Sequence, residues 1–379
     1  MAGSDRRIRA GVVGAGHMGQ YHILVFAELW DVDLVGIVDT DVDRAQRLAG
    51  QYGTQAFAGH RALIGKVDVA SVAVPTEQHF AVTRDLLAAG VHVLVEKPMT
   101  PTLEEAKELF RLARQRRAVL HVGHVERFNG AVQELKKIVE RPILIESRRL
   151  GPFVPRVQND TVVMDLMIHD IDIVLGLVNG EPRRINAVGR SVQSNLPDVA
   201  NVQIVFDTGT LANITASRAT EQKIRTLHIT QPDAYITLDY TDQDIQIHRR
   251  AAQEYTLNRE SIRYRQAAFV EHLFVHKDNP LKLEVLHLIQ AAREAQAGGP
   301  VELAEGEDLR SLAVALEIER MIREGRGKRP GRRIFRGACA RPDVRGRHPP
   351  GPRRLRSPAP GVARGGVRLR GSPRPRSGR

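Results

Sequence analysis

Two stretches of this sequence place ionisable side chains where they could act together on one substrate. Glu96 and Lys97 end an apolar run, and Pro98 stops it. Asp165, His169 and Asp172 recur at helical spacing further along the chain. A lysine ammonium stabilises negative charge that develops on an oxygen, and an imidazole beside a carboxylate accepts a proton near neutral pH. Together these groups suit the oxidation of an alcohol, in which the carbon loses a hydride and the hydroxyl loses a proton.

Residues 161–178 read as one long helix, and Asp165 and His169 lie four residues apart on one face of it. The carboxylate would fix the tautomer of the imidazole and raise its basicity. A purely structural reading, in which the pair ties the helix to a neighbouring strand, remains open. Whether Lys97 or His169 takes the proton also remains open, because burial could lower the pKa of the lysine. The pattern offers no clear third metal ligand, so no metal is predicted.

The first of these stretches lies within a pattern typical of a dinucleotide site. Gly14-x-Gly16-x-x-Gly19 separates a predicted strand from a predicted helix, and Asp39 follows the next strand, 20 residues after Gly19. The glycines allow a tight turn and the approach of a pyrophosphate, and the aspartate accepts hydrogen bonds from a ribose. NAD is therefore the predicted cofactor, although nearby Arg44 leaves NADP open. The predicted cofactor contacts are Gly14, Gly16, His17, Met18, Gly19, Asp39, Pro75, Thr76, His79, Glu96 and Lys97.

These residues must be positioned by an α/β fold. Strands and helices alternate along residues 1–124, which predicts a doubly wound parallel sheet, a Rossmann domain. Its expected strands are 7–13, 34–38, 68–74, 91–96 and 118–123, separated by helices 17–29, 42–52, one that ends at 89, and 102–116.

Residues 125–325 predict an α+β domain with a large, open, mainly antiparallel sheet. Its expected strands are 143–150, 184–192, 201–206, 210–217, 224–230, 234–240 and 244–248. Helices are expected over 161–178, 261–276, 281–296 and 306–324. An open sheet with one uncovered face is a plausible contact between copies, so a homo-oligomer, dimer or tetramer, is expected.

Composition limits the class of protein. The 379 residues suffice for two domains, and no apolar run reaches the length of about 18 residues that a membrane span needs. Met1 to Ala10 lacks the apolar core of a secretory signal, so a cytoplasmic protein is expected. The single cysteine, Cys339, excludes an internal disulfide.

The net charge of +12 comes from one end of the chain. Residues 326–379 hold 18 of the 56 Lys and Arg and one of the 44 Asp and Glu, which leaves residues 1–325 at about −5. Any nucleic-acid binding is therefore confined to this Arg-, Pro- and Gly-rich tail, which is too polar to form a core. A functional extension, an inert one and out-of-frame translation all fit it.

Taken together, Gly14-x-Gly16-x-x-Gly19, Glu96-Lys97-Pro98 and Asp165-x-x-x-His169-x-x-Asp172 resemble the Gfo/Idh/MocA family of sugar and inositol dehydrogenases, in order and spacing. The resemblance covers roughly residues 6–325. It implies a tightly held nicotinamide cofactor, an open sheet that mediates oligomerisation, and a catalytic group made of Lys97, Asp165 and His169. It also places Glu96 beside the nicotinamide.

A narrower resemblance lies in 123–129, 165–173 and 231–235, which look like the family members that oxidise the 3-hydroxyl of UDP-N-acetylglucosamine. Their 3-keto product is passed to an aminotransferase for lipid A synthesis. This resemblance implies that Arg127, Asn129 and Asp172 contact the sugar. A pyrophosphate needs cations, and the candidates are Arg148, Arg149, Arg218, Lys223 and Arg225. Other polyols and nucleotide sugars remain alternatives, as does an NAD sensor, although a sensor would be expected to lack Lys97 or His169.

Overall fold

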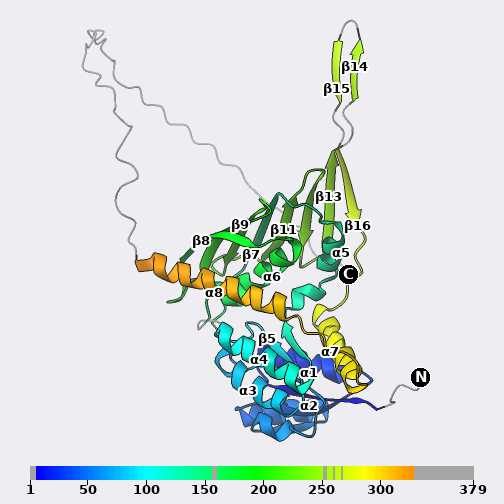
Figure 1. Cartoon of the computed structure of the whole chain (residues 1–379), viewed down its shortest axis with the longest axis vertical. Coiled ribbons are helices and arrows are strands. Elements are labelled where there is room, and N and C mark those ends of the chain that lie inside the picture. The colour runs from blue at the N-terminus through cyan, green and yellow to red at the C-terminus, as the bar shows by residue number, and fades with distance from the viewer. Residues whose placement is uncertain (1–5, 156–159, 251–253, 259–260, 266–267, 328–379) are drawn as a thin grey trace, which may run out of the picture. The chain divides into compact units, whose positions relative to one another are not determined.

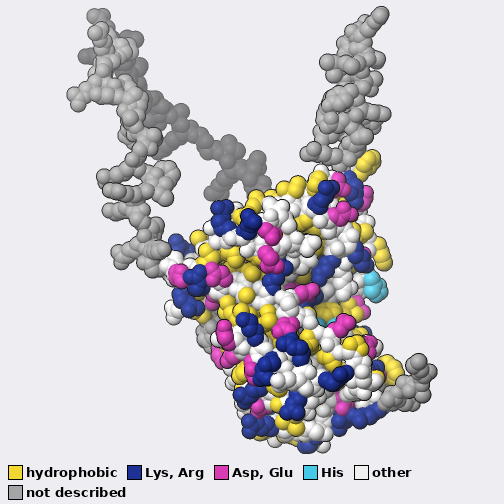
Figure 2. Space-filling model, viewed as in Figure 1, with side chains coloured by type: hydrophobic (Ala, Val, Ile, Leu, Met, Phe, Trp, Pro, Cys, Tyr) yellow, Lys and Arg dark blue, Asp and Glu magenta, His cyan; other side chains and the backbone are white. Residues whose placement is uncertain are grey.

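The computed structural model describes residues 6–155, 160–250, 254–258, 261–265 and 268–327. These residues build two large sheets and a small two-stranded one, with helices packed between and around the large sheets (Figure 1). The predicted α/β fold is confirmed. None of the helices in this part of the chain combines the length and the apolar character needed to cross a bilayer. Figure 2 shows acidic and basic side chains mixed over one face, in agreement with the near-neutral charge of residues 1–325.

The first sheet has six parallel strands in the order β3-β2-β1-β4-β5-β6. The strand order reverses between β1 and β4, and ligands bind at such a switch point. The strands are β1 (Ile8–Val13), β2 (Val32–Val38), β3 (Gln55–Phe57), β4 (Val69–Val72), β5 (His92–Glu96) and β6 (Leu120–Gly123). The helices that connect them are α1 (His17–Glu28), α2 (Val42–Tyr52), α3 (Thr76–Ala88) and α4 (Leu103–Arg116).

The second sheet has eight strands in the order β16-β13-β12-β11-β7-β10-β9-β8, and only β7 and β10 pair in parallel. In the inner strands β7 and β9 alternate residues are buried, as expected for a sheet covered on one face. The strands are β7 (Leu144–Leu150), β8 (Pro182–Arg190), β9 (Val199–Phe206), β10 (Leu211–Ser217), β11 (Ile224–Thr230), β12 (Ala234–Asp239), β13 (Asp244–Arg250) and β16 (Ala268–Leu273). The covering elements are the short 3-10 helix η2 (Val125–Phe128), α5 (Gly130–Ile138), η4 (Val163–Met167) and α6 (Ile168–Leu177).

The prediction of a helix over 261–276 is wrong. The backbone there forms β15 (Ser261–Arg265), which pairs with β14 (Glu254–Asn258), and then β16, which pairs along the whole of β13. Helix-favouring residues such as Arg and Glu prompted the prediction. Propensity is a weak preference, and pairing with an open sheet edge outweighs it.

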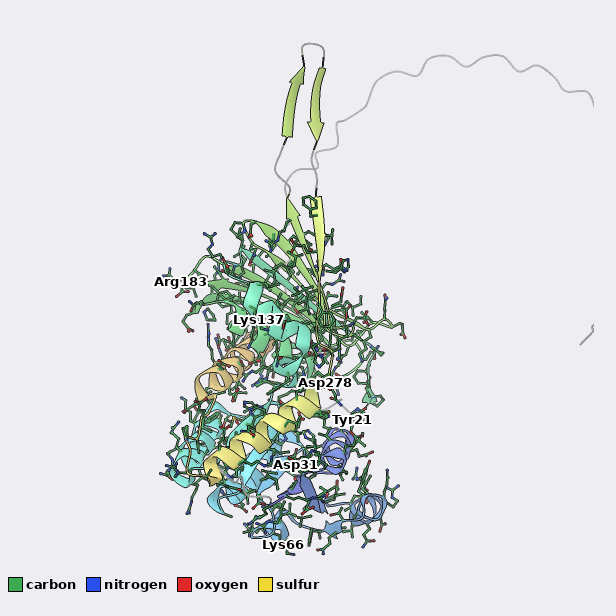
Figure 3. The ribbon with its side chains drawn as sticks, turned by 90° about the vertical axis from the view of Figure 1, so that its right-hand side faces the viewer. Tyr21, Asp31, Lys66, Lys137, Arg183 and Asp278 are labelled. Carbon is green, nitrogen blue, oxygen red and sulfur yellow. The ribbon has the colours of Figure 1, made fainter. Side chains whose placement is uncertain are left out.

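Two C-terminal helices return to the first sheet. Val285 and Leu288 of α7 (Pro280–Gln296) join the core beneath β1 and α1, and Arg293 pairs with Asp31 at 2.8 Å. Figure 3 labels Asp31, in the first domain, and Asp278, shortly before α7. In α8 (Glu305–Gly327), Leu312 packs with the first domain and Ile318 with the second. Residues assigned by sequence to 125–325 thus complete both cores. The predicted tail, 326–379, lies outside the described residues except for the end of α8.

Candidate active site

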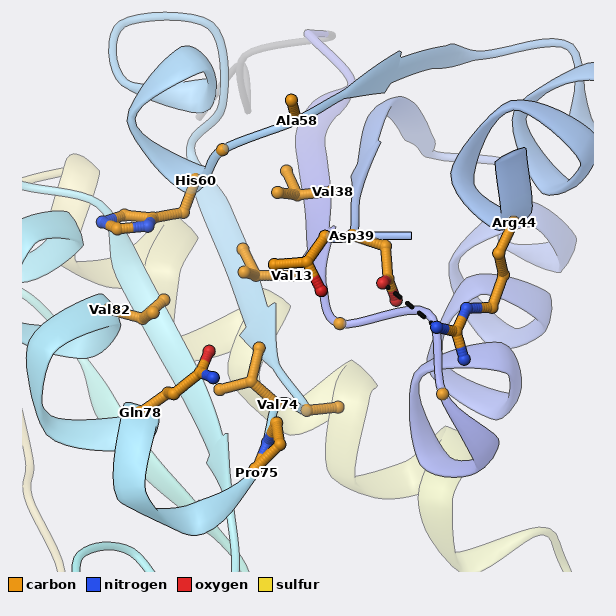
Figure 4. A pocket seen from close by; sticks show the side chains of 15 residues that line it. Val13, Val38, Asp39, Arg44, Ala58, His60, Val74, Pro75, Gln78 and Val82 are labelled. Atoms are coloured by element: carbon orange, nitrogen blue, oxygen red, sulfur yellow. Dashed lines mark hydrogen bonds and ion pairs between the residues drawn. The ribbon is translucent and has the colours of Figure 1, made fainter. Parts of the chain in front are cut away.

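A first cleft opens at the carboxyl ends of β1, β2 and β4 (Figure 4). Gly14 has φ +93°, and a Cβ there would lie 2.4 Å from the carbonyl oxygen of Ala73. At Gly19 a Cβ would collide with the carbonyl of Gly14, whereas at Gly16 it would meet only open space. The turn is therefore tight on its inner side and open toward the cleft, which suits a pyrophosphate at the start of α1.

Asp39 lies in this cleft as the sequence predicts. Its carboxylate accepts hydrogen bonds from the backbone N–H of Ala15, at 2.7 Å, and of Asp41, at 2.8 Å. These bonds hold the side chain at the end of β2, where a ribose hydroxyl could reach it. Arg44 lies 3.1 Å from Asp41 and 3.4 Å from Asp39, so its charge is already balanced by two carboxylates. The arrangement suits NAD.

Of the other predicted cofactor residues near this cleft, only Pro75 lines it, and His79, Thr76 and His17 do not. Pro75 lines the first cleft. His79 lies beneath it, 1% exposed, with Nδ1 and Nε2 each 2.9 Å from a carbonyl oxygen, those of Pro98 and Val74. Thr76 begins α3, and His17 begins α1 with its ring against Tyr21. Polar residues that were not predicted, Thr40, His60 and Gln78, also line this cleft. Only their positions shortly after strands could have signalled them.

A second cleft of about 430 Å³ lies between the two domains and is large enough for a small ligand. Met18, Glu96 and Lys97 come from the first domain, and Asp165 and His169 from the second. The structure therefore brings together two stretches that are 68 residues apart from Lys97 to Asp165. The remaining lining residues are Val125, Glu126, Arg149, Leu150, Gly151, Pro152, Val154, Leu166, Arg218, Lys223 and Arg225.

Lys97 is held by the element that carries Asp165. Its Nζ donates a hydrogen bond to the Asp165 carbonyl oxygen at 2.6 Å and lies 3.8 Å from the carboxylate of the same residue. Glu96, just before it, accepts a hydrogen bond from His22 Nε2 at 2.8 Å. Burial raises the pKa of Glu96, but His22, Lys97 and His79 together outweigh it, so the pKa lies below its usual value. Glu96 is thus an anion beside the lysine.

His169 lines the second cleft, but its predicted hydrogen bond to Asp165 is not found in the described structure. Its buried Nδ1 has no partner there. The cause is local: Val163–Met167 forms a π-helical turn, η4, whose wider spacing takes the two side chains out of the i,i+4 register. Burial and the charge of Lys97 lower the pKa of His169 well below its usual value. The expected pKa near neutrality is therefore wrong, and the imidazole is neutral.

Two of the predicted phosphate-binding arginines are already paired. Arg149 makes a bidentate ion pair with Asp170, at 2.8 and 3.2 Å, and a third bond to Glu126 at 2.8 Å. Arg218 pairs with Asp198 at 2.9 Å. Both arginines are almost fully buried. Arg148 lies on the exposed face of β7 and does not line the cleft.

Lys223 and Arg225 differ from these arginines. Both line the second cleft, and neither forms an ion pair with any residue that the structure describes. Arg225 is paired across the sheet with Arg149, so the two guanidinium groups share one face. Charge repulsion from Arg225, followed by desolvation, lowers the pKa of Lys223, and burial followed by Arg149 lowers that of Arg225. Cations that repel each other at a cleft are a ready site for an anion.

Three residues expected at the sugar are not brought to this cleft. Arg127 donates to Asp172 at 2.7 Å and lies 2.8 Å from Asp308, while Ser311 donates to Asp172 at 2.7 Å. These bonds join η2, α6 and α8. Asn129 is buried, caps α5 and donates to the carbonyl oxygen of Tyr240 at 3.0 Å. The polar groups of Arg127, Asn129 and Asp172 thus form hydrogen bonds between elements of the fold. Within the described ranges, no three His, Cys, Asp or Glu side chains gather to hold a metal.

Comparison with known families agrees with this architecture. Residues 8–124 match a family model described as an oxidoreductase family with an NAD-binding Rossmann fold. Residues 133–236 match the GFO/IDH/MocA C-terminal domain. The first match covers the first sheet, and the second covers α5 through the start of β12.

Individual relatives narrow the comparison. The chain is 37% identical over 246 residues to UDP-N-acetylglucosamine 3-dehydrogenase of Acidithiobacillus ferrooxidans, covering 65% of this chain and 78% of the relative. The solved structure of that enzyme, GnnA, aligns with a TM-score of 0.74 and 32% identity over 84% of this chain and 98% of its own. An inositol 2-dehydrogenase/D-chiro-inositol 3-dehydrogenase of Shouchella clausii is 28% identical over 213 residues, covering 52% of this chain and 61% of its own.

Proposed function

Because this chain belongs to the Gfo/Idh/MocA family of NAD-dependent oxidoreductases, we propose that its substrate is UDP-N-acetylglucosamine, oxidised at the 3-hydroxyl. The observation that carries the proposal is the pair of unpartnered cations, Lys223 and Arg225, in the same cleft as Lys97 and His169. A polyol without phosphate offers those cations hydroxyl oxygens but no negative charge to neutralise. A nucleoside diphosphate supplies two negative groups beside the sugar. The similarity to the Acidithiobacillus enzyme supports the same substrate.

The arrangement of the second cleft supports a division of roles. NAD, held along Gly14, Gly16 and Asp39, supplies the hydride acceptor. The ammonium of Lys97, fixed by the Asp165 carbonyl oxygen at 2.6 Å, stabilises negative charge on the hydroxyl oxygen. The neutral imidazole of His169 accepts the hydroxyl proton. Because its pKa is low, His169 holds that proton only briefly and must pass it on.

The product of this reaction would be a 3-keto sugar still attached to UDP. A ketone is the functional group that an aminotransferase converts to an amine. We therefore extend the proposal to a partner aminotransferase that makes a 3-amino sugar, with lipid A synthesis as the pathway. Coupled conversion of UDP-N-acetylglucosamine to its 3-amino derivative, by this protein with such an enzyme and an amino donor, is the test. Accumulation of the ketone alone would reject the coupling.

The proposed substrate is tested by a single-turnover absorbance scan at 340 nm. The protein with NAD is mixed in turn with UDP-N-acetylglucosamine, free N-acetylglucosamine, glucose and myo-inositol. We expect NADH to form with the UDP-sugar alone, and product analysis then gives the ring position. NADH formation with inositol or glucose, and none with the UDP-sugar, would reject the proposal in favour of a polyol dehydrogenase of the kind named among the relatives.

Removal of both cations is expected to separate binding from chemistry. In Lys223→Ala/Arg225→Ala, the KM for UDP-N-acetylglucosamine should rise by about 10–100-fold, because two charge-assisted hydrogen bonds are lost, while kcat changes little. UDP, as a competitive inhibitor, should weaken in parallel. Arg148→Ala is the matched control, since Arg148 lies on the exposed face of the neighbouring strand. A double variant with unchanged KM would show that the pyrophosphate lies elsewhere.

The exposed face of the eight-stranded sheet supports the further proposal of a homo-oligomer. Apolar side chains are exposed along it, among them Val188 at 67% and Val270 at 48%. Tyr235 lies between His228 and His248 on the same sheet. A second copy would cover these side chains. The mass from light scattering tests this, and a monomer at working concentration would reject it.

A further inference from the structure

The second cleft has one stretch of lining to which the proposed reaction gives no role. The chain from Leu150 to Val154 leaves the end of β7, and all of these residues except Phe153 line the cleft. Leu150, Pro152 and Val154 carry neither a charge nor a hydrogen-bonding group on their side chains. An apolar wall in a cleft that binds charged groups suits a ligand that has an apolar part as well.

The pairing of β7 with β11 gives the position of this stretch relative to the two unpartnered cations. Arg149 pairs with Arg225, and Leu150 pairs with Ile224. When this register is continued by one residue, Lys223 lies level with Gly151. The apolar stretch therefore continues outward from the level of Lys223.

The reacting groups lie at the other end of this order. Arg149 donates hydrogen bonds to Asp170, and Asp170 follows His169 in α6. Moving outward from His169, the cleft presents first Arg225, then Lys223, and then the side chains of Pro152 and Val154. This is the order in which a sugar, a diphosphate and a nucleoside are joined in a nucleotide sugar.

Hydrogen bonds fix the backbone of the apolar stretch. The Gly151 N–H donates to the Ser217 carbonyl oxygen at 2.9 Å, and the Gly151 carbonyl oxygen accepts from the N–H and the hydroxyl of Thr220, each at 3.2 Å. The Phe153 ring packs against the guanidinium of Arg218, 5.3 Å from the ring centroid. Pro152 has no N–H to offer.

The side chains of Leu150, Pro152 and Val154 form what we call the apolar ledge. Leu150 is nearly buried, whereas Pro152 and Val154 are exposed, Val154 at 39%. The ledge thus offers a ligand apolar contact at the mouth of the cleft, where a bulky group can extend into solvent.

Apolar contact and hydrogen bonding differ in how well they distinguish one base from another. Every nucleobase has an apolar face, so contact with the face tolerates all of them. The bases differ along their polar edges, and only a site that hydrogen-bonds such an edge rejects the wrong partner by as much as about 10⁴–10⁵-fold. The ledge has no side-chain donor or acceptor with which to bind an edge.

On the basis of the proposed function, we propose that Leu150, Pro152 and Val154 hold the nucleoside of the substrate by its apolar surface. The enzyme then recognises the sugar and the diphosphate, through Lys223 and Arg225, but not the base. Its substrate class is N-acetylglucosamine joined to a nucleoside diphosphate, with purine and pyrimidine bases both accepted.

The test compares the dissociation constants of UDP, CDP, ADP and GDP by isothermal titration calorimetry. The protein is first saturated with NAD, so that ADP cannot occupy the first cleft. The four constants should agree within about tenfold, because an apolar surface discriminates weakly. UMP should bind about tenfold or more weakly than UDP, since one charged group is lost. A preference for UDP over ADP and GDP of more than about tenfold would overturn the proposal.

Variants of the ledge separate contact with the nucleoside from contact with the phosphates. Pro152→Ala/Val154→Ala should weaken all four nucleoside diphosphates by a similar factor, about 3–10-fold, and leave inorganic pyrophosphate unchanged. Val154→Ala, which keeps the proline, should show part of this loss. Ile143→Ala is the matched control, because Ile143 is 51% exposed just before the opposite end of β7. Equal losses for UDP and pyrophosphate, or no loss for either, would overturn the ledge.

The outcomes distinguish this proposal from the proposed function. If UDP-N-acetylglucosamine reduces NAD but ADP-N-acetylglucosamine has less than about one tenth of its kcat/KM, the ledge is wrong and the proposed substrate stands. If the four diphosphates bind alike but UDP-N-acetylglucosamine yields no NADH, the proposed substrate is wrong and the ledge stands. If neither the diphosphates nor pyrophosphate bind, both proposals are rejected.

Discussion

Replacing Lys97 with alanine is expected to lower kcat by about 10²–10⁴-fold, the size of effect typical of a lost acid–base or oxyanion-stabilising group. The side chain is only 16% exposed, and its Nζ is fixed by the Asp165 carbonyl oxygen at the cleft that also holds His169. In the described structure the only other lysine that lines this cleft is Lys223, which we propose binds the pyrophosphate of the substrate. NADH formation in a stopped-flow instrument, with saturating NAD and sugar, measures the change.

Two controls make this result specific. Lys107→Ala removes an exposed lysine from α4 of the same domain and should leave kcat unchanged. Added methylamine should restore part of the activity of Lys97→Ala, because a small cation can enter the space left by the side chain. If kcat of Lys97→Ala stays within about threefold of the unmodified value, the role assigned to Lys97 is wrong.

The largest expected loss of stability comes from Arg149→Ala. Arg149 is 2% exposed, makes three hydrogen bonds to Asp170 and Glu126, and lies with its guanidinium 4.9 Å from the Tyr240 ring centroid. Its loss leaves two carboxylates buried without their cation, which typically lowers the free energy of unfolding by about 3–5 kcal/mol. Urea denaturation, followed by circular dichroism at neutral pH, measures the change.

Arg148→Ala is the natural comparison for Arg149→Ala, because the two residues are adjacent on β7 and point to opposite faces. An exposed change of this kind usually alters stability by no more than about 0.5 kcal/mol. Equal effects of the two substitutions would show that the buried ion pairs contribute little.

The sequence predicted best what depends on local pattern. The alternation of strands and helices, the tight turn at Gly14 and the position of Asp39 after β2 each follow from neighbouring residues, and the structure agrees. The same reasoning selected Lys97 and His169, which both line the second cleft. A side chain just after a buried strand or on one face of a helix has few possible orientations. Sequence reasoning could not identify the side chain with which each charged residue forms an ion pair. Arg127 and Arg149 were predicted to bind substrate, but each forms an ion pair with an aspartate from a distant element of the fold.

Two errors have the same physical origin. The residues from 261 to 276 have helical propensity, but an open strand, β13, offered pairing that only the folded sheet provides. Asp165 and His169 have helical spacing, but the extra residue in the π-helical turn breaks that register. In both cases tertiary contacts overrode a local preference. That Lys223 and Arg225 form no ion pair with any described residue is likewise a property of three-dimensional placement, which composition does not reveal.

The return of α7 and α8 to the first sheet has a consequence for synthesis on the ribosome. The nucleotide-binding sheet is complete once Gly123 has been made, but the part of its apolar core that α7 and α8 cover stays exposed until Val285 and Leu312 emerge. At about 5–20 residues per second, the roughly 190 intervening residues take on the order of 10–40 s. During that time the nascent sheet exposes the surface that chaperones bind. The order of the chain, rather than its final contacts, thus sets when this protein is most prone to aggregate.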